Sequence, residues 1–167
     1  LDVKFLGIIL QFIGSLSFLL FGMKLMSDGV QKSAGKSLHR VLGFMTGNRF
    51  FAMLTGLFIT MIIQSSGATT VMVVSFVNAG LMNLAQAIGV IFGANIGTTI
   101  TAWIVAVFGF KFDVAALAIP LFGLGYMMKN IKKINKPNVG EAIMGFGLLF
   151  YGLELLKDLM SFDASQI

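Results

Sequence analysis

A long uncharged stretch limits what this chain can fold into. No aspartate, glutamate, lysine, arginine or histidine occurs over residues 50–110, between Arg49 and Lys111. That length suffices for about three helical crossings of a bilayer core ~30 Å thick. Over the whole chain 57% of residues are hydrophobic and 11% are charged, whereas soluble domains carry about 25% charged residues. The sequence predicts an all-α integral membrane protein and excludes a soluble globular or disordered chain.

Apolar runs flank this stretch on both sides. The run between Lys4 and Lys24 predicts a first span over residues 5–26. The alternative, a cleaved signal peptide, would have an apolar core of about 7–15 residues and then a small-residue cleavage site, which this run lacks. Further spans are predicted over residues 114–128 and over about residues 139–156. We therefore expect a multi-pass protein embedded in the lipid bilayer of the cytoplasmic membrane.

Basic residues gather in two segments. Over residues 29–45 apolar side chains recur at three- and four-residue spacing with basic side chains opposite, which predicts an amphipathic helix in the membrane interface. The segment between the two later spans is also basic. By the positive-inside rule we expect both segments to face the cytoplasm. No basic stripe is interleaved with aromatic residues, so we expect no nucleic acid partner. The basic residues concerned are Lys24, Lys32, Lys36, Arg40, Arg49, Lys129, Lys132, Lys133 and Lys136.

Two polar clusters interrupt the uncharged stretch. The first, residues 64–70, reads Gln-Ser-Ser-Gly-Ala-Thr-Thr and lies between apolar arms that are each too short to cross a bilayer. This pattern predicts a re-entrant helical hairpin over residues 50–81 with its tip near the bilayer midplane. The second cluster, residues 93–99, lies in the middle of a span over residues 84–108. It predicts a broken transmembrane helix, with the break at residues 94–97.

Both clusters offer groups that bind ions. Amide and hydroxyl oxygens can replace the hydration shell of sodium without a fixed charge. A helix restarting after each cluster would present N–H groups and a positive dipole end to an oxyanion such as phosphate. The alternatives are that Gly93 and Gly97 form a helix-packing motif and that the hydroxyls bond back to their own helix. Two clusters in one uncharged stretch favour a site, and we expect them to lie together.

An internal repeat relates the two ends of the chain. Residues 19–28 align without a gap to residues 149–158, with glycine at the fourth and aspartate at the tenth position of both. Chance similarity between two apolar helices is the alternative. The predicted topology runs the first copy into the cytoplasm and the second copy out, as in the inverted repeats of secondary transporters. We therefore predict one transporter repeat over residues 1–136 and the first helix of a second, inverted repeat over residues 137–167.

The two polar clusters also carry a family resemblance. Residues 62–74 followed by residues 93–99 resemble the type II sodium-phosphate cotransporter family, whose repeats carry a Gln-Ser-Ser-Ser tip. Gly67 stands in the place of the third serine of that tip. Residues 21–26 and 152–154 also look like the bacterial members. The resemblance implies sodium-coupled symport of inorganic phosphate by alternating access, in a protein built from two inverted repeats.

Candidate site residues come from both clusters. The residues expected to bind sodium are Gln64, Ser65, Ser66, Thr69 and Asn95. The residues expected to bind phosphate are Ser65, Ser66, Gly67, Ala68, Asn95, Thr98 and Thr99. Sodium is the only metal ion expected, and the chain has zero cysteines for a thiolate metal site. Sodium and phosphate are transported ions, and no cofactor is expected.

Other functions remain as alternatives. The sequence stops before a second tip appears, so we expect a homodimer or a complementary second repeat as partner, or else a fragment inactive in transport. A passive channel-like subunit would need a continuous polar stripe along several helices. An intramembrane hydrolase using Ser65 or Ser66 would need a base at the same depth, and residues 50–110 contain no histidine, carboxylate or lysine. We therefore expect no enzymatic activity.

Overall fold

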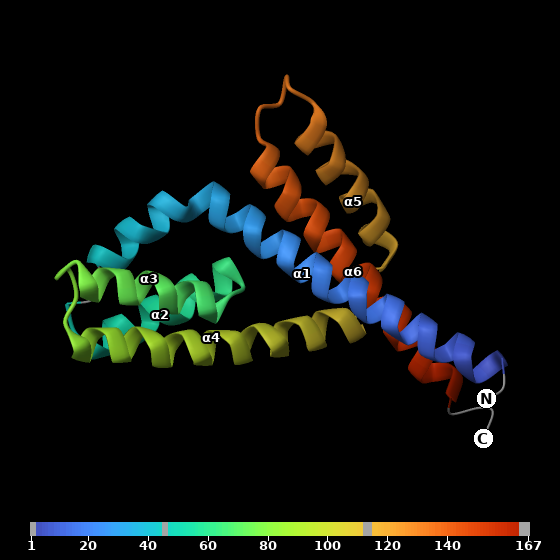
Figure 1. The fold of residues 1–167 in the computed structure, drawn as a ribbon, viewed down its shortest axis with the longest axis horizontal. Helices are drawn as coiled ribbons and strands as arrows, with labels where there is room; N and C mark the ends of the chain where they lie inside the picture. The colour runs from blue at the N-terminus through green and yellow to red at the C-terminus, as the bar shows by residue number, and fades with distance from the viewer. Residues whose placement is uncertain (1–2, 45–46, 112–114, 164–167) are drawn as a thin grey trace. The chain divides into compact units, whose positions relative to one another are not determined.

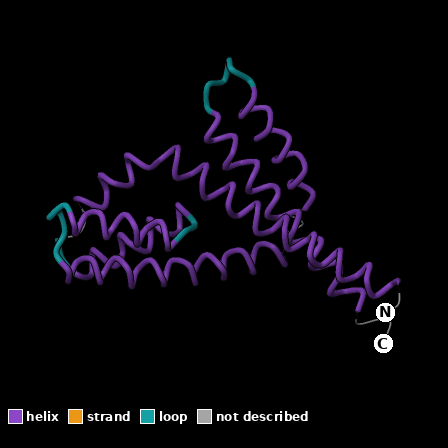
Figure 2. Tube along the Cα trace, in the orientation of Figure 1, coloured by secondary structure: helices purple, strands orange, loops and turns teal. Residues whose placement is uncertain are grey.

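The computed structural model describes residues 3–44, 47–111 and 115–163, and this part of the chain consists of helices and loops (Figures 1 and 2). Three of these helices are long and apolar enough to cross a membrane, over Val3–Gly43, Leu84–Phe108 and Pro137–Ser161. The prediction of an all-helical membrane protein is confirmed at this level. The helices are α1 (Val3–Phe44), α2 (Arg49–Ile63), α3 (Ser66–Asn78), α4 (Leu84–Lys111), α5 (Ala115–Asn130) and α6 (Pro137–Asp163).

The chain divides into two compact units. The hairpin unit comprises Val30–Val107, and the α5–α6 unit comprises Leu1–Gly29 together with Phe108–Ile167. Helix α1 is continuous through residues 27–28, where the sequence analysis separates a span from an interfacial helix. The interfacial position of its second half stays a prediction.

Capping side chains fix the short helices of the hairpin unit. Asn48 precedes α2, and its side chain accepts a hydrogen bond from the N–H of Phe50 at 2.7 Å. After α3, Gly80 has φ +70°, a left-handed conformation that glycine adopts without steric cost. Asn83 and Gln86 then exchange side-chain to backbone hydrogen bonds of 2.9 and 3.0 Å, a capping box that starts α4.

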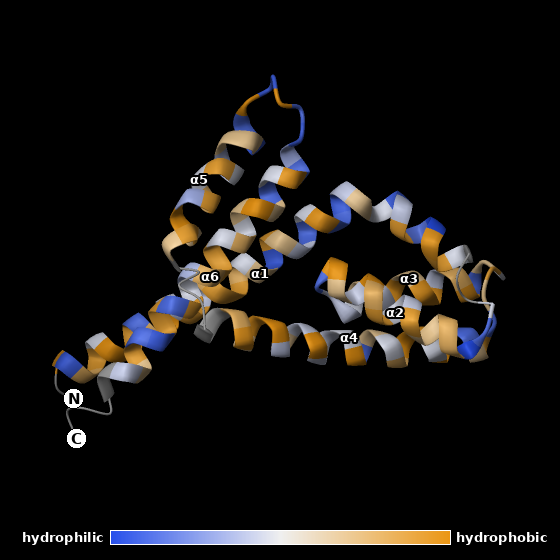
Figure 3. Cartoon of the chain, turned by 180° about the vertical axis from the view of Figure 1, so that it is seen from behind, coloured by the Kyte–Doolittle hydropathy of each residue, from blue (hydrophilic) through white to orange (hydrophobic). Residues whose placement is uncertain are grey.

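Helix α4 is unbroken, so the predicted break at residues 94–97 is wrong. The glycines of α4 instead form a helix-packing motif, the alternative to a break, and lie close against α2. A Cβ at Gly93 would overlap the carbonyl oxygen of Met53, and one at Gly97 would lie 2.6 Å from that of Leu57. Figure 3 shows hydrophobic residues along the length of α4. The backbone of α4 thus stays hydrogen-bonded within the helix, as an apolar environment requires.

The core of the hairpin unit lies between α2, α3, α4 and the last turns of α1. Leu42, from α1, is fully buried with 0% of its surface exposed. Around it pack apolar residues from both arms of the hairpin and from α4. The buried members of this core are Leu38, Leu42, Ala52, Ile59, Ile63, Val73, Met82, Ala87 and Val90.

In the α5–α6 unit, α1 and α6 pack along an antiparallel line of glycines. Gly22 lies against the backbone of Leu149, and Gly29 lies against the backbone of Ala142. Residue numbers that increase along α1 therefore contact residue numbers that decrease along α6, so the two helices are antiparallel. Helix α5 packs on another face of α6, and the loop between α5 and α6 is mostly hydrophilic (Figure 3). Pro137 stands at the first helical position of α6, where its missing N–H costs nothing.

Replacing Gly93 with alanine should destabilise the hairpin unit by about 1–3 kcal/mol, because the added methyl group forces α2 and α4 apart. The measurement is the free energy of unfolding in mixed micelles, followed by circular dichroism. Gly123→Ala is the matched control, since a Cβ at Gly123 meets nothing within 4 Å. Equal stability of the two variants would contradict the packing role of Gly93.

Candidate functional site

The turn between α2 and α3 has an unusual backbone. Gln64 caps the C-terminus of α2 with φ 59° and ψ 30°, in the left-handed region. A glutamine in this region is uncommon, and such conformations concentrate at functional sites. The turn is short, because α2 ends at Ile63 and α3 begins at Ser66.

The side chain of Gln64 ties this turn to α4. Its Nε2 donates to the carbonyl oxygen of Met61 and, at 3.2 Å, to the hydroxyl of Thr101. The Thr101 hydroxyl in turn donates to the carbonyl oxygen of Gly97 at 2.9 Å. Because both amide hydrogens are engaged, the side-chain carbonyl oxygen of Gln64 is the group left to accept a donor or coordinate a cation.

The start of α3, which follows Gln64 directly in the sequence, supplies backbone donors. Ser65 is the N-cap, and its Oγ accepts from the N–H of Ala68 at 3.2 Å. The N–H groups of Ser66 and Gly67 belong to the first turn, where an α-helix provides no internal acceptor. A Cβ at Gly67 would meet only the Ser65 Oγ, at 4.0 Å, so this position has room for a serine side chain.

A buried pair of hydroxyl groups joins the two arms behind the turn. The hydroxyls of Thr60 and Thr69 lie 2.9 Å apart, and these residues are 1% and 0% exposed. The hydroxyl of Thr69 also lies 3.1 Å from the carbonyl oxygen of Ser65. Thr69 therefore braces the turn from inside the unit, and its expected sodium contact stays a prediction.

The candidate threonines on α4 make their hydrogen bonds within α4 and not with the turn at Gln64. Asn95, Thr98 and Thr99 are exposed. Thr98 and Thr99 donate to the carbonyl oxygens of Ala94 and Asn95, at 3.1 and 3.3 Å. This back-bonding is the alternative that the sequence analysis left open. The hydrogen bond from the tip reaches α4 at Thr101 instead, beyond the second cluster.

The parallel packing of α2 and α4 explains this register. Met53 lies opposite Gly93, and Leu57 lies opposite Gly97. The end of α2 therefore lies level with the next turn of α4, where Thr101 is found. Sequence reasoning missed Thr101, although a signal existed, because Thr101 follows Gly93 and Gly97 at four-residue intervals and so shares their face.

Neutral groups alone make up this site. Gln64, Ser65 and Ser66 are half-buried and carry no charge. Among the described residues, no group of three or more histidine, cysteine, aspartate or glutamate side chains could hold a metal ion. The arrangement can offer an amide oxygen and hydroxyl oxygens to a monovalent cation, and backbone N–H groups to an anion.

Comparisons with known proteins identify relatives. The chain is 30% identical over 149 residues to the "Putative inorganic phosphate export protein YjbB" of Escherichia coli, covering 89% of this chain and 26% of that protein. It is 28% identical over 144 residues to the "Uncharacterized protein YqeW" of Bacillus subtilis, covering 86% of this chain and 45% of that one. Over 103 residues, 60% of this chain, it is 33% identical to 15% of the human "Sodium-dependent phosphate transport protein 2B".

The chain thus spans about a quarter of the length of YjbB, at 26%. No solved structure matches it. The sequence model of a transport family, described as Na+/Pi-cotransporter, matches residues 18–158. This range contains the tip, the glycine-rich face of α4 and the glycines at which α1 and α6 make their antiparallel contact. The match to a transport family agrees with the prediction that the chain is not an enzyme. The chain belongs to the Na+/Pi-cotransporter family.

Proposed function

We propose that this chain forms one half of a sodium-coupled symporter of inorganic phosphate that works by alternating access. The observation that carries the proposal is the left-handed turn at Gln64, held to α4 by Thr101 and followed at once by the start of α3. This places neutral oxygen ligands and backbone N–H donors within four consecutive residues, 64–67. One turn can thus serve a cation and an oxyanion together.

The start of α3 suits phosphate. The positive end of the helix dipole and the first-turn N–H groups favour an anion, and Ser66 and Gly67 supply these groups. The hydroxyls of Ser65 and Ser66 can add side-chain contacts. On α4, Asn95, Thr98 and Thr99 expose polar groups that can complete the phosphate site in the assembled transporter. Because α4 is continuous, these contacts come from side chains and not from a second helix start.

The same turn suits sodium. The carbonyl oxygen of Gln64 is oriented by the two hydrogen bonds of its amide nitrogen. The hydroxyls of Ser65, Ser66 and Thr69 lie within the next five residues. A ring of neutral oxygens binds an alkali cation without holding it as strongly as a carboxylate would, which permits release.

Helix lengths support a re-entrant arrangement of the hairpin. At 1.5 Å per residue, the 15 residues of α2 and the 13 of α3 extend only about 22 and 20 Å. Neither reaches across a hydrocarbon core of about 30 Å. A hairpin that enters and leaves on one side would bring Gln64 to mid-depth, where irregular backbone must be buried in protein or line an aqueous cavity.

The proposal includes a second repeat of opposite orientation. A single tip offers too few groups to replace the water around a divalent phosphate, whereas two facing tips offer twice as many. The antiparallel contact of α1 with α6 supports this, since the first helices of two inverted repeats run in opposite directions. The second repeat comes from another copy or from a complementary half.

Sodium-dependent uptake is the decisive measurement. In proteoliposomes with the two-repeat assembly, we expect labelled phosphate to accumulate under an inward sodium gradient and not under an inward potassium gradient. Accumulation that ignores the cation would indicate a passive channel-like subunit. If correctly inserted protein shows none, the chain is inactive in transport. Sodium-driven accumulation by a monomer verified by cross-linking would contradict the two-repeat requirement.

Removing the hydroxyl that holds Gln64 should weaken sodium dependence. In an active assembly, Thr101→Val should raise the half-saturating sodium concentration about two- to tenfold, since one hydrogen bond contributes about 0.5–1.5 kcal/mol. Gln64→Ala should abolish sodium dependence. Ser75→Ala is the control, because the exposed Ser75 hydroxyl bonds only within its own helix, to Val71 at 2.9 Å. An unchanged sodium response in Thr101→Val would rule out the positioning role.

The orientation of the chain can be tested with single cysteines, because the native chain has none. A membrane-impermeant maleimide should label Lys36→Cys and Lys132→Cys from the cytoplasmic side only, as the positive-inside rule requires. Both side chains are exposed. Inside-out and right-side-out vesicles provide the two arms of the measurement. Labelling from the opposite side alone would invert the proposed topology.

A further inference from the structure

The contacts between α1 and α6 follow the symmetry of the internal repeat. Gly22 lies against the backbone of Leu149, and Gly152 lies against the backbone of Leu19. Residues 19–28 align with residues 149–158, so the first contact becomes the second when the two helices exchange roles. An approximate two-fold axis therefore relates α1 to α6. Each helix should then offer its partners equivalent faces.

One of these faces is filled on α6. Helix α5 packs there at two glycines of α6, in an antiparallel direction. A Cβ at Gly140 would lie 2.6 Å from the backbone nitrogen of Lys129, and a Cβ at Gly147 would lie 2.6 Å from the carbonyl oxygen of Ala118. Gly125 of α5 contributes a third close backbone approach, since a Cβ there would lie 2.6 Å from the carbonyl oxygen of Gly140. The face is built for direct contact between helix backbones.

The equivalent face on α1 is open. The repeat offset is 130 positions, because residue 19 aligns with residue 149. Met144 also lies on the covered face of α6, with its backbone against Gly125 of α5. Subtracting the offset from Gly140, Met144 and Gly147 gives Leu10, Gly14 and Ser17. Leu10 is 60% exposed, Ser17 is exposed, and a Cβ at Gly14 meets nothing within 4 Å.

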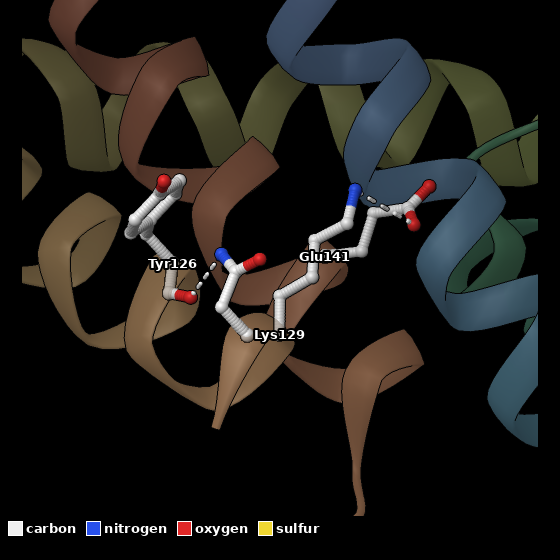
Figure 4. A network of polar contacts seen from close by, with 4 residues as sticks. Tyr126, Lys129 and Glu141 are labelled. Carbon is white, nitrogen blue, oxygen red and sulfur yellow. Dashed lines mark hydrogen bonds and ion pairs between the residues drawn. The ribbon is translucent and has the colours of Figure 1, made fainter. Parts of the chain in front are cut away.

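A groove lies beside this face of α1. Its volume is about 380 Å³, and it is lined by Gln11, Gly14, Ser15, Phe18, Leu155, Asp158 and Leu159. The position equivalent to Gln11 is Glu141 in α6. Glu141 is 8% exposed, and its carboxylate lies 3.5 Å from the Nζ of Lys129 in α5 (Figure 4). On α6, α5 thus covers the corner at Glu141, whereas the equivalent corner of α1, at Gln11, lines the groove.

We propose that the face of α1 formed by Leu10, Gly14 and Ser17 docks a membrane-spanning helix of the complementary repeat. This helix is apolar, runs antiparallel to α1 as α5 runs to α6, and brings a small residue against Gly14. Because Gln11 is neutral where Glu141 is charged, the incoming helix needs a hydrogen-bonding group at this corner and no counter-ion. The inference rests on the two-repeat part of the proposed function and names the surface through which the second repeat attaches.

Disulfide trapping in lipid bilayers tests the docking. The full chain carries Gly14→Cys, and the probe is a synthetic peptide of residues 115–133 carrying Gly125→Cys, the helix that fills the equivalent face. We expect a disulfide yield several-fold higher than with the control chain Phe12→Cys, because Phe12 is 48% exposed but lies about 160° around the helix from Gly14. A peptide carrying Gly123→Cys is the second control. If Gly14→Cys inserts poorly, Ser17→Cys replaces it on the same face.

Two outcomes of the trapping experiment would overturn the docking. Equal yields at Gly14→Cys and Phe12→Cys would show that α1 has no preferred face. Cross-linking of Gly14→Cys chains to each other, undiminished by excess peptide, would assign the face to a second copy of α1. Failure of the docking and failure of the proposed function are distinguishable, because the uptake assay needs no peptide. Sodium-driven uptake without trapping contradicts only the docking, and trapping without uptake contradicts only the transport function.

Discussion

Direct backbone contact between helices is the interaction on which this structure depends. Lipid provides no hydrophobic force between apolar helices, so their association relies on close packing. Gly93 allows the backbone of α2 to approach α4 closely, and Gly22 and Gly152 allow the same close approach between α1 and α6. The glycines therefore fix the register between helices. That register places Thr101 level with Gln64, so the geometry of the tip is a consequence of glycine packing one turn away.

Local features of the fold were predictable from the sequence. The absence of charge over residues 50–110 required membrane helices, and the run Gln-Ser-Ser between short apolar arms located the turn at Gln64. Both are properties of neighbouring residues, because a helix length and a capping serine are decided within one or two turns. The Ser65 cap and the capping box before α4 have the same local origin.

The unbroken α4 was not predictable from its own residues. Glycines four positions apart fit a break and fit close packing equally well, and the choice depends on whether another helix lies against them. Here the other helix is α2, whose Met53 and Leu57 are 40 residues distant in sequence from Gly93 and Gly97. Thr101 shares the face of these glycines, but its partner Gln64 is separated from it by 37 positions, so its spacing gains meaning only when α2 lies against that face. Contacts of this kind are set by tertiary packing, which local patterns do not encode.

A neutral tip has a consequence for coupling in the proposed symporter. Without a fixed charge, the field at the tip comes from the dipole of α3 and from oriented amide and hydroxyl groups. A bound sodium ion would then be the main positive charge near the phosphate, and phosphate the main negative charge near sodium. Each ion raises the affinity for the other by the same factor, as linkage requires. Thr101 enters this balance by orienting the amide of Gln64, so one hydroxyl on α4 can influence the binding of both ions.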